Sequence, residues 1–551
     1  MARRLGRGDA LKHYAPWIIG AGFMAVLLPP VISVLSAGVL DAGVGSWFER
    51  VSAVLARSGT WRSLRFSAGQ AAVSALICIV LALPGAYFLS HVAFPGRRIV
   101  QSLSLLPFVL PSLIMILAVL SFYGRNGLLN QLLGTDLVVV YSPVGIVIAH
   151  VLFNISVALR IIATGWMEVD ERYREVSVSL GEDGFARLRH LHLPLLMPAI
   201  LGAGTIIFLY CFVSFGIVLI FGGVRYATLE VRIYQEMFVN LNLTAAGALA
   251  ALQLVVCAVV VLLLQWSSGR RHTISDRGRE FRVRAWNSVA AATRWFCMGY
   301  WALIALIFFS PLAAIVIRAF RPAGRWSTAA FASLITGRVG DRDIHEIIRA
   351  GFGELLLTSL GIALVSALLS TTLAFFAARA LRGKQVPWLD TLVSLPLAVS
   401  SVTYSLGIWL LLSRLLPGIV LVWATQSLMA FPLVFRSTRN VVNSFPLRYT
   451  ESAQSLGAGL WFRIGTLEVP VLRRGMLNSF TFAFALSLSD FTAVFTIGRG
   501  EIVTFPVAMY RLIGFQSFDV ALALGVWYIA IVALVFALID STSYAREGQG
   551  L

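Results

Sequence analysis

The chain of 551 residues is 58% hydrophobic and only 13% charged, with a mean hydropathy of +0.84. These proportions exclude a disordered chain and argue against a soluble globular protein, in which about a quarter of the residues are charged. The net charge of +18 comes from 44 basic and 26 acidic residues. Because they are spread among apolar runs, nucleic-acid binding is disfavoured and a protein of the lipid membrane is expected.

Apolar windows long enough to cross a membrane, about 20 residues each, recur along the chain. The first is too long for a cleaved signal peptide and predicts a retained span. The first six predicted spans cover residues 17–40, 66–92, 103–122, 144–164, 195–221 and 244–265. The second six cover residues 295–319, 355–380, 390–413, 417–438, 471–497 and 517–540. We therefore predict an all-α polytopic membrane protein with about 12 transmembrane helices.

A basic polar segment separates the two sets of spans. We predict a first half over residues 1–266, a linker over 267–294 and a second half over 295–551. Because basic loops between spans stay in the cytoplasm, the linker and both termini are expected on that side of the membrane. The loop over 320–353, expected outside, also holds five arginines, so the orientation rests mainly on the linker.

One polar segment, between the fourth and fifth predicted spans, recurs in both halves. Its matched residues are Glu175, Ser177, Gly181 and Pro194 in the first copy and Glu451, Ala453, Gly457 and Pro470 in the second. Every pair has the same separation, 451 − 175 = 276. Farther upstream Ser74 matches Ser366, and the separation there is 366 − 74 = 292. An internal repeat of this length predicts two homologous six-helix halves.

Each residue type in the repeated segment suits a particular place in a helical loop. A glutamate favours the positive end of a helix dipole, so Glu175 and Glu451 are expected to open a short helix. The glycine suits a left-handed helix end, and the proline suits the first turn of the next span. A single copy is explained equally well by a surface helix that only rejoins two spans. Identical spacing in two copies favours a rigid knob that docks on a partner.

The second copy has the pattern Glu-x-Ala-x-x-x-Gly, nine residues, an apolar residue, any residue, Val and Pro. This pattern resembles the EAA loop of binding-protein-dependent ABC importer permeases, from which the first copy departs at Ser177. The resemblance implies the type I ABC importer permease fold in the cell inner membrane, with each loop a coupling helix seated on a cytoplasmic ATPase. It implies two ATPase subunits, which hold ATP and Mg²⁺, and an extracytoplasmic substrate-binding protein. No cofactor is expected on this chain itself.

Two fused halves with two such loops resemble the ferric-iron and thiamine branch of that family. The thiamine likeness rests on residues 123–235, including the segments 142–146 and 211–215. One departure is Ile155, where the family has a proline after Phe-Asn. The resemblance implies a permease that moves thiamine and its phosphates into the cytoplasm, with ferric iron as the alternative substrate.

Motifs for chemistry are missing from the sequence. It contains no phosphate-binding loop, paired-cysteine pattern or hydrolase motif, so no catalytic residue and no metal ligand is expected. The chain is thus expected to be no enzyme, with ATP hydrolysed by a partner. A secondary transporter or channel, which needs no ATPase, is an alternative, and a membrane-embedded enzyme is a weaker one.

Aromatic and acidic residues in the spans are candidates for a substrate pathway. An aromatic face attracts a cationic ring such as the thiazolium of thiamine, and a carboxylate can offset its lost hydration. The candidate pathway residues are Tyr210, Phe212, Phe215, Asp490 and Phe491. For Asp490, a gate or packing role is the alternative, because an Asp-Phe pair here resembles permeases of many substrates.

Overall fold

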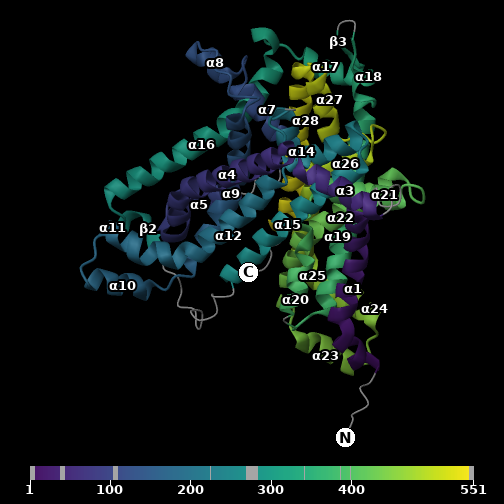
Figure 1. Cartoon of the computed structure of the whole chain (residues 1–551). Helices are drawn as coiled ribbons and strands as arrows, with labels where there is room; N and C mark the ends of the chain where they lie inside the picture. The colour runs from purple at the N-terminus through teal and green to yellow at the C-terminus, as the bar shows by residue number, and fades with distance from the viewer. Residues whose placement is uncertain are drawn as a thin grey trace. The chain divides into compact units, whose positions relative to one another are not determined.

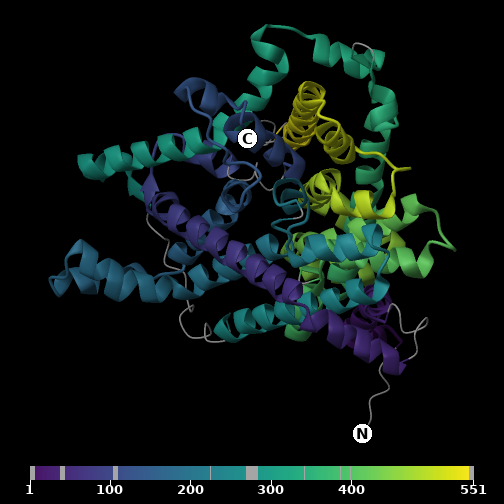
Figure 2. The same cartoon turned by 45° about the horizontal axis from the view of Figure 1, so that its top comes forward.

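The structure is a computed structural model that describes residues 7–36, 44–103, 110–223, 225–268, 283–339, 342–384, 386–397 and 399–544. Most of these residues lie in helices (Figure 1; Figure 2). Ten of the described helical segments are long and apolar enough to cross a membrane. The predicted all-α polytopic membrane fold is thereby confirmed.

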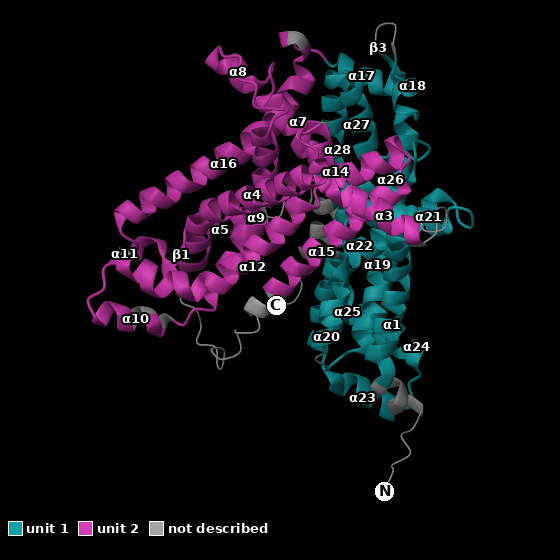
Figure 3. Ribbon diagram, in the orientation of Figure 1, with its two compact units in different colours: residues 1–37, 328–551 teal, residues 38–327 magenta. Residues whose placement is uncertain are grey.

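The helices form two compact units, one of residues 1–37 and 328–551 and the other of residues 38–327 (Figure 3). In chain order, the unit of residues 38–327 contains α3 (Val44–Ala56), α4 (Ser58–His91), β1 (Val92–Ala93), α5 (Arg97–Leu103), α7 (Ser112–Tyr123), α8 (Leu128–Leu133), α9 (Pro143–Met167), α10 (Glu171–Ser179), α11 (Gly184–Arg187), η1 (Leu188–His192), α12 (Leu193–Phe212), α13 (Gly216–Phe221), α14 (Leu229–Tyr234), η2 (Gln235–Val239), α15 (Leu243–Ser268), β2 (Arg284–Ala285), η4 (Trp286–Ser288), α16 (Ala291–Phe320) and η5 (Pro322–Gly324).

The other unit contains α1 (Arg7–Leu35), α17 (Ala329–Thr336), β3 (Arg338–Val339), β4 (Arg342–Asp343), α18 (Ile344–Ile348), α19 (Phe352–Ala380), α20 (Pro387–Val393), η6 (Leu395–Leu397), α21 (Ser401–Leu412), α22 (Gly418–Ser444), α23 (Leu447–Ser455), α24 (Leu460–Arg463), η7 (Ile464–Glu468), α25 (Val469–Ser489), α26 (Thr492–Ile497), α27 (Phe505–Gly514) and α28 (Phe518–Tyr544). The short strands pair as β1 with β2 in parallel and β3 with β4 in antiparallel.

The centre of each unit is a packed set of three helices. Helix α4 packs against α9 and α12, and α19 packs against α22 and α25. Ser67 in α4 accepts a hydrogen bond from the backbone N–H of Leu229 at 2.9 Å, and Ser359 in α19 accepts one from Phe505 at 3.0 Å. Since 359 − 67 = 292 and 505 − 229 = 276, the contacts reproduce both offsets of the sequence repeat.

The two compact units do not coincide with the predicted halves of the sequence. The first helix of each half, α1 or α16, packs with helices of the other half. Helix α1 packs along α21, where Gly407 lets the carbonyl of Pro30 approach so closely that a Cβ would lie 1.9 Å from it. Helix α16 packs on α7 and α4, and the Tyr300 hydroxyl donates to the Leu81 carbonyl at 2.7 Å. The half boundaries at 1–266 and 295–551 remain a prediction about the repeat.

Some predicted spans differ in their limits. The window 390–413 is divided into α20, η6 and α21. The windows 195–221 and 471–497 each break once, because α12 ends at Phe212 and α25 at Ser489, and short helices follow. Parts of three predicted spans and of the linker lie outside the described residues: 37–40 of the first span, 104–109 of the third, 398 of the ninth and 269–282 of the linker.

Candidate functional site

The two repeated segments belong to helical loops of the same construction. The first loop (residues 168–194) joins α9 to α12, and the second loop (residues 445–470) joins α22 to α25. Each has a nine-residue helix, α10 or α23, then a one-turn helix and a π-helical turn, η1 or η7. The π-helical turns begin 464 − 188 = 276 residues apart, so the loops follow the same succession of turns.

The repeated glutamates lie in the middle of their helices. Helix α10 begins directly after Asp170, whose carboxylate accepts a backbone N–H at 2.9 Å, and α23 begins directly after Pro446. The prediction that Glu175 and Glu451 open the helices is wrong, because these upstream residues start each helix four residues earlier. Glu451 is exposed, and the side chain of Glu175 lies outside the described part of the chain.

The glycines and prolines of the loops have the conformations that their spacing predicts. Gly181 has a φ of 76° and Gly457 one of 81°, in the left-handed region that glycine adopts without strain. Pro194 and Pro470 lie in the first turn of α12 and α25, where a missing N–H costs no hydrogen bond. In each loop, the left-handed glycine thus follows the end of the nine-residue helix, and the π-helical turn leads into the next long helix.

Replacing Gly181 or Gly457 by alanine should loosen that loop by about 1 kcal/mol, because a Cβ strains the left-handed backbone. The added atom itself would meet nothing within 4 Å. Gly184→Ala and Gly459→Ala are matched controls, since neither glycine has a positive φ or a neighbour within 4 Å. We expect limited proteolysis to cut the first pair of variants about fivefold faster than the controls. Equal cleavage rates would contradict the left-handed turns.

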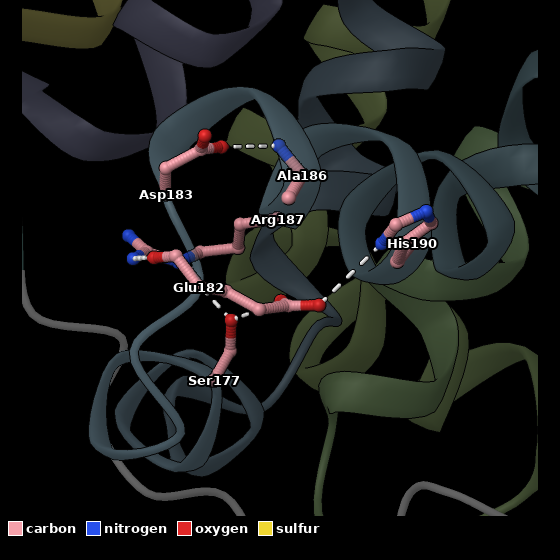
Figure 4. Close-up of polar contacts among 6 residues, drawn as sticks. All are labelled: Ser177, Glu182, Asp183, Ala186, Arg187 and His190. Atoms are coloured by element: carbon pink, nitrogen blue, oxygen red, sulfur yellow. Dashed lines mark hydrogen bonds and ion pairs between the residues drawn. The ribbon is translucent and has the colours of Figure 1, made fainter.

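Ser177, the departure from the family pattern, is buried in a polar network inside the first loop (Figure 4). Its hydroxyl donates to a carboxylate oxygen of Glu182 at 2.6 Å and accepts from Arg187 Nε at 3.2 Å. Arg187 Nη2 donates to the Glu182 carbonyl at 2.7 Å, and His190 Nδ1 lies 3.5 Å from the other carboxylate oxygen. The network fastens α10 to the turn that follows it, and an alanine at residue 177 could not take part.

The second loop has a different interior. Ala453 and Ala458 occupy the positions of Ser177 and Glu182, and neither side chain can form a hydrogen bond. Arg463, whose counterpart completes the network of the first loop, is buried, and its Nε has no hydrogen-bond partner among the described residues. The two loops therefore have the same backbone course, but different side-chain contacts stabilise it.

Both loops expose apolar side chains at matched positions. Tyr173 and Tyr449 are exposed on the short helices, and Leu180 and Leu456 are 76% and 88% exposed beside the left-handed glycines. A cavity of about 560 Å³ lies beside Tyr173 and Leu180 in the first loop. Exposed apolar groups at a defined place are typical of a partner-binding surface. These four residues were not among the predicted site residues, although the 276-residue offset links both pairs.

Two of the predicted pathway residues are placed alike in the two halves. The ring of Phe215 lies 5.2 Å from that of Tyr234, and the ring of Phe491 lies 5.4 Å from that of Tyr510. Both phenylalanines directly precede a short helix, α13 or α26, at the point where a long helix has broken. Each phenylalanine–tyrosine pair therefore lies at the break in a long helix, at corresponding positions of the repeat.

The other predicted pathway residues have separate surroundings. The carboxylate of Asp490 accepts the backbone N–H of Thr492 at 3.0 Å and of Ala493 at 3.3 Å, at the start of α26. This contact agrees with the alternative packing role for Asp490. Phe212 is fully buried on α12, and Tyr210 is half-buried two residues earlier. A role in the pathway stays a prediction for all of these residues.

Comparisons with known proteins test the family resemblance. Residues 79–272 match the family described as binding-protein-dependent transport system inner membrane component. The thiamine transport system permease protein ThiP of Brucella abortus (strain 2308) is 30% identical in an alignment 534 positions long that covers 94% of each chain. ThiP of Salmonella typhimurium is 29% identical, covering 90% of this chain and 91% of its own.

A shorter relative aligns with only part of the chain. The molybdenum transport system permease protein ModB of Mycobacterium bovis is 27% identical over 45% of this chain and 91% of its own length. The alignment thus spans nearly all of ModB but only about half of this chain. With the full-length alignments, this confirms the resemblance seen in the repeated loops. The chain belongs to the family of inner-membrane permeases of binding-protein-dependent transport systems.

Proposed function

We propose that this chain is the membrane permease of an ATP-driven importer of thiamine and its phosphates. The support for this substrate is the alignment, over nearly the whole chain, with relatives named for thiamine transport. The aromatic pairs of Phe215 with Tyr234 and Phe491 with Tyr510 agree with it, because aromatic faces attract a positive ring such as thiazolium. Ferric iron, the alternative substrate, is not favoured by these alignments.

In this proposal the two loops dock on two copies of a cytoplasmic ATPase, which hold ATP and Mg²⁺. The matched exposed leucines, Leu180 and Leu456, are the centres of the docking surfaces. A substrate-binding protein delivers thiamine on the opposite side of the inner membrane. Both termini and the basic linker (267–294) then lie in the cytoplasm, in accord with the excess of arginine there.

The chain is proposed to form and break no covalent bonds itself. The energy of ATP hydrolysis therefore reaches it only through movement of the docked ATPase subunits. Closure of the ATPase pair on ATP moves the docked loops, and the helices that the loops join shift between outward and inward access. A docked partner can shift this equilibrium only as far as its affinities for the two states differ. Rigid loops suit this task, because a loop that deformed on docking would absorb the movement.

Reconstitution tests the proposal directly. The chain is placed in liposomes with its ATPase subunits and binding protein, and ATP hydrolysis is measured with thiamine or with ferric ion. We expect stimulation by thiamine and none by ferric ion, and the reverse would identify an iron importer. If no ATPase copurifies and Glu175→Ala with Glu451→Ala leaves uptake unchanged, the chain is a secondary transporter or channel and the proposal is wrong.

A further inference from the structure

The C-terminal end of α19 contacts the second loop at both of its ends. Arg379 makes a two-point ion pair with Glu468, with 2.7 Å from Nε to Oε2 and 3.1 Å from Nη2 to Oε1. Arg382, in the turn that directly follows α19, donates from Nη2 to the Phe445 carbonyl and from Nη1 to Thr450 Oγ1 at 3.2 Å. Its guanidinium also lies 4.7 Å from the centre of the Phe445 ring. Phe445 and Thr450 are at the start of the loop, and Glu468 is at its end.

The contacts of this α19 clamp, defined as Arg379 and Arg382, are largely shielded from solvent. Glu468 is only 2% exposed, so its carboxylate is paired in a region of low dielectric. The pKa of the Arg382 guanidinium is lowered, because burial and the nearby positive charge of Arg379 together outweigh the opposing effect of the Glu468 carboxylate. A bidentate guanidinium–carboxylate pair fixes direction as well as distance. The clamp therefore leaves the base of the loop little freedom to move without α19.

The same places are joined in the first half by different chemistry. Tyr87 in α4 matches Arg379, since 379 − 87 = 292, and His192 matches Glu468, since 468 − 192 = 276. There the ring of Trp166, at the end of α9, lies 5.5 Å from Tyr87 and 4.9 Å from His192. An aromatic cluster thus joins the helix to the loop where the second half uses charge. Because both halves keep a contact between the helix and the loop, although with different residue types, we infer that the contact itself has a role.

Helix α19 is also fastened at its other end. The Ser359 hydroxyl accepts the first backbone N–H of α27, from Phe505, at 3.0 Å. Ser359 and Arg379 are 20 residues apart in one continuous helix, a distance of about 30 Å. A displacement of the second loop that moves Arg379 along the axis is carried over that length to the segment bound by Ser359.

We propose that Arg379 and Arg382 are positioning residues that transmit movement of the second loop through α19 to α27, coupling ATP hydrolysis to transport. This inference rests on the proposed function. It assigns the coupling in this half to side chains outside the repeated motif. Loss of the clamp should leave the ATPase docked and hydrolysing ATP while the helices no longer follow.

The test measures thiamine transported per ATP hydrolysed in the reconstituted complex. Arg379→Gln and Glu468→Gln should each lower this ratio on the order of tenfold, within the usual range of coupling between sites, while hydrolysis persists. Exchange of the pair, Arg379→Glu with Glu468→Arg, should restore much of the ratio. Arg436→Gln is the control, because Arg436 lies in the same unit and donates to Ser394 Oγ at 2.7 Å, a residue that belongs neither to the second loop nor to the clamp.

Unchanged ratios in both single variants would overturn the proposal, and so would an equal fall in the Arg436→Gln control. If the single variants fail to accumulate in the membrane, Arg379→Lys decides, because it keeps the charge but loses the two-point geometry. A reduced ratio in that variant supports the clamp, and a wild-type ratio refutes it. A wild-type complex without thiamine-stimulated hydrolysis would instead refute the importer function itself.

Discussion

Exchanging both exposed leucines for glutamate, Leu180→Glu with Leu456→Glu, is expected to abolish docking of the ATPase and with it ATP-driven uptake. Each leucine that enters a protein groove contributes about 1.5–3 kcal/mol from burial. The double variant should therefore bind the ATPase at least about 100-fold more weakly, as measured by the dissociation constant with the permease in nanodiscs. Each single variant should retain one docked loop and bind with intermediate affinity.

The control for this result is Leu415→Glu. Leu415 is 76% exposed, as Leu180 is, but lies between α21 and α22, outside both loops. All of these variants should accumulate to the wild-type level, because no described packing is lost at an exposed side chain. Equal ATPase affinity in the double variant and in the Leu415→Glu control would refute the assignment of the docking surfaces.

A second large effect is expected at Gly407, where α1 crosses α21. A Cβ on Gly407 would lie 1.9 Å from the Pro30 carbonyl oxygen and 2.5 Å from its carbon, so the two backbones must separate. Overpacking of this kind costs about 1–3 kcal/mol and more where only backbone can yield. Gly407→Val should therefore lower the thermal unfolding midpoint of the purified protein in detergent and detach α1 from α21.

Gly361→Val gives the comparison for this variant, since Gly361 lies within α19 with nothing within 4 Å of an added Cβ. The same change of residue type inside a helix of the same unit should leave the unfolding midpoint near that of the wild type. If both variants unfold at the same temperature, close packing at Gly407 does not stabilise the unit.

The sequence pattern predicted those features of the fold that depend on local chemistry. Apolar windows predicted most of the long helices, and residue types at fixed spacing predicted the left-handed glycines and the prolines in the loops. The contacts of Ser67 and Ser359 correspond at the offsets of the sequence repeat, although no sequence signal singled out either serine. These features follow from solvation and from backbone preferences, which each segment carries by itself.

Other features depend on partners far away in the sequence. The breaks after Phe212 and Ser489 lie inside apolar windows, where hydropathy does not distinguish one helix from two. The pairing of Arg379 with Glu468 joins residues 89 positions apart, and no local signal marks it. Ser177 looked like a simple departure from a family pattern until its bonds to Glu182 and Arg187 gave it a place.

The packing of α1 also has a consequence for biosynthesis. The Ser33 hydroxyl lies 3.0 Å from the Gly407 carbonyl, yet 374 residues separate the two. At about 5–20 residues per second, α1 leaves the ribosome roughly 20–75 s before its partner α21 exists. The first helix made thus cannot reach its final packing until a partner 374 residues later has been translated, and the unit to which it belongs can only be completed after nearly the whole chain has been made.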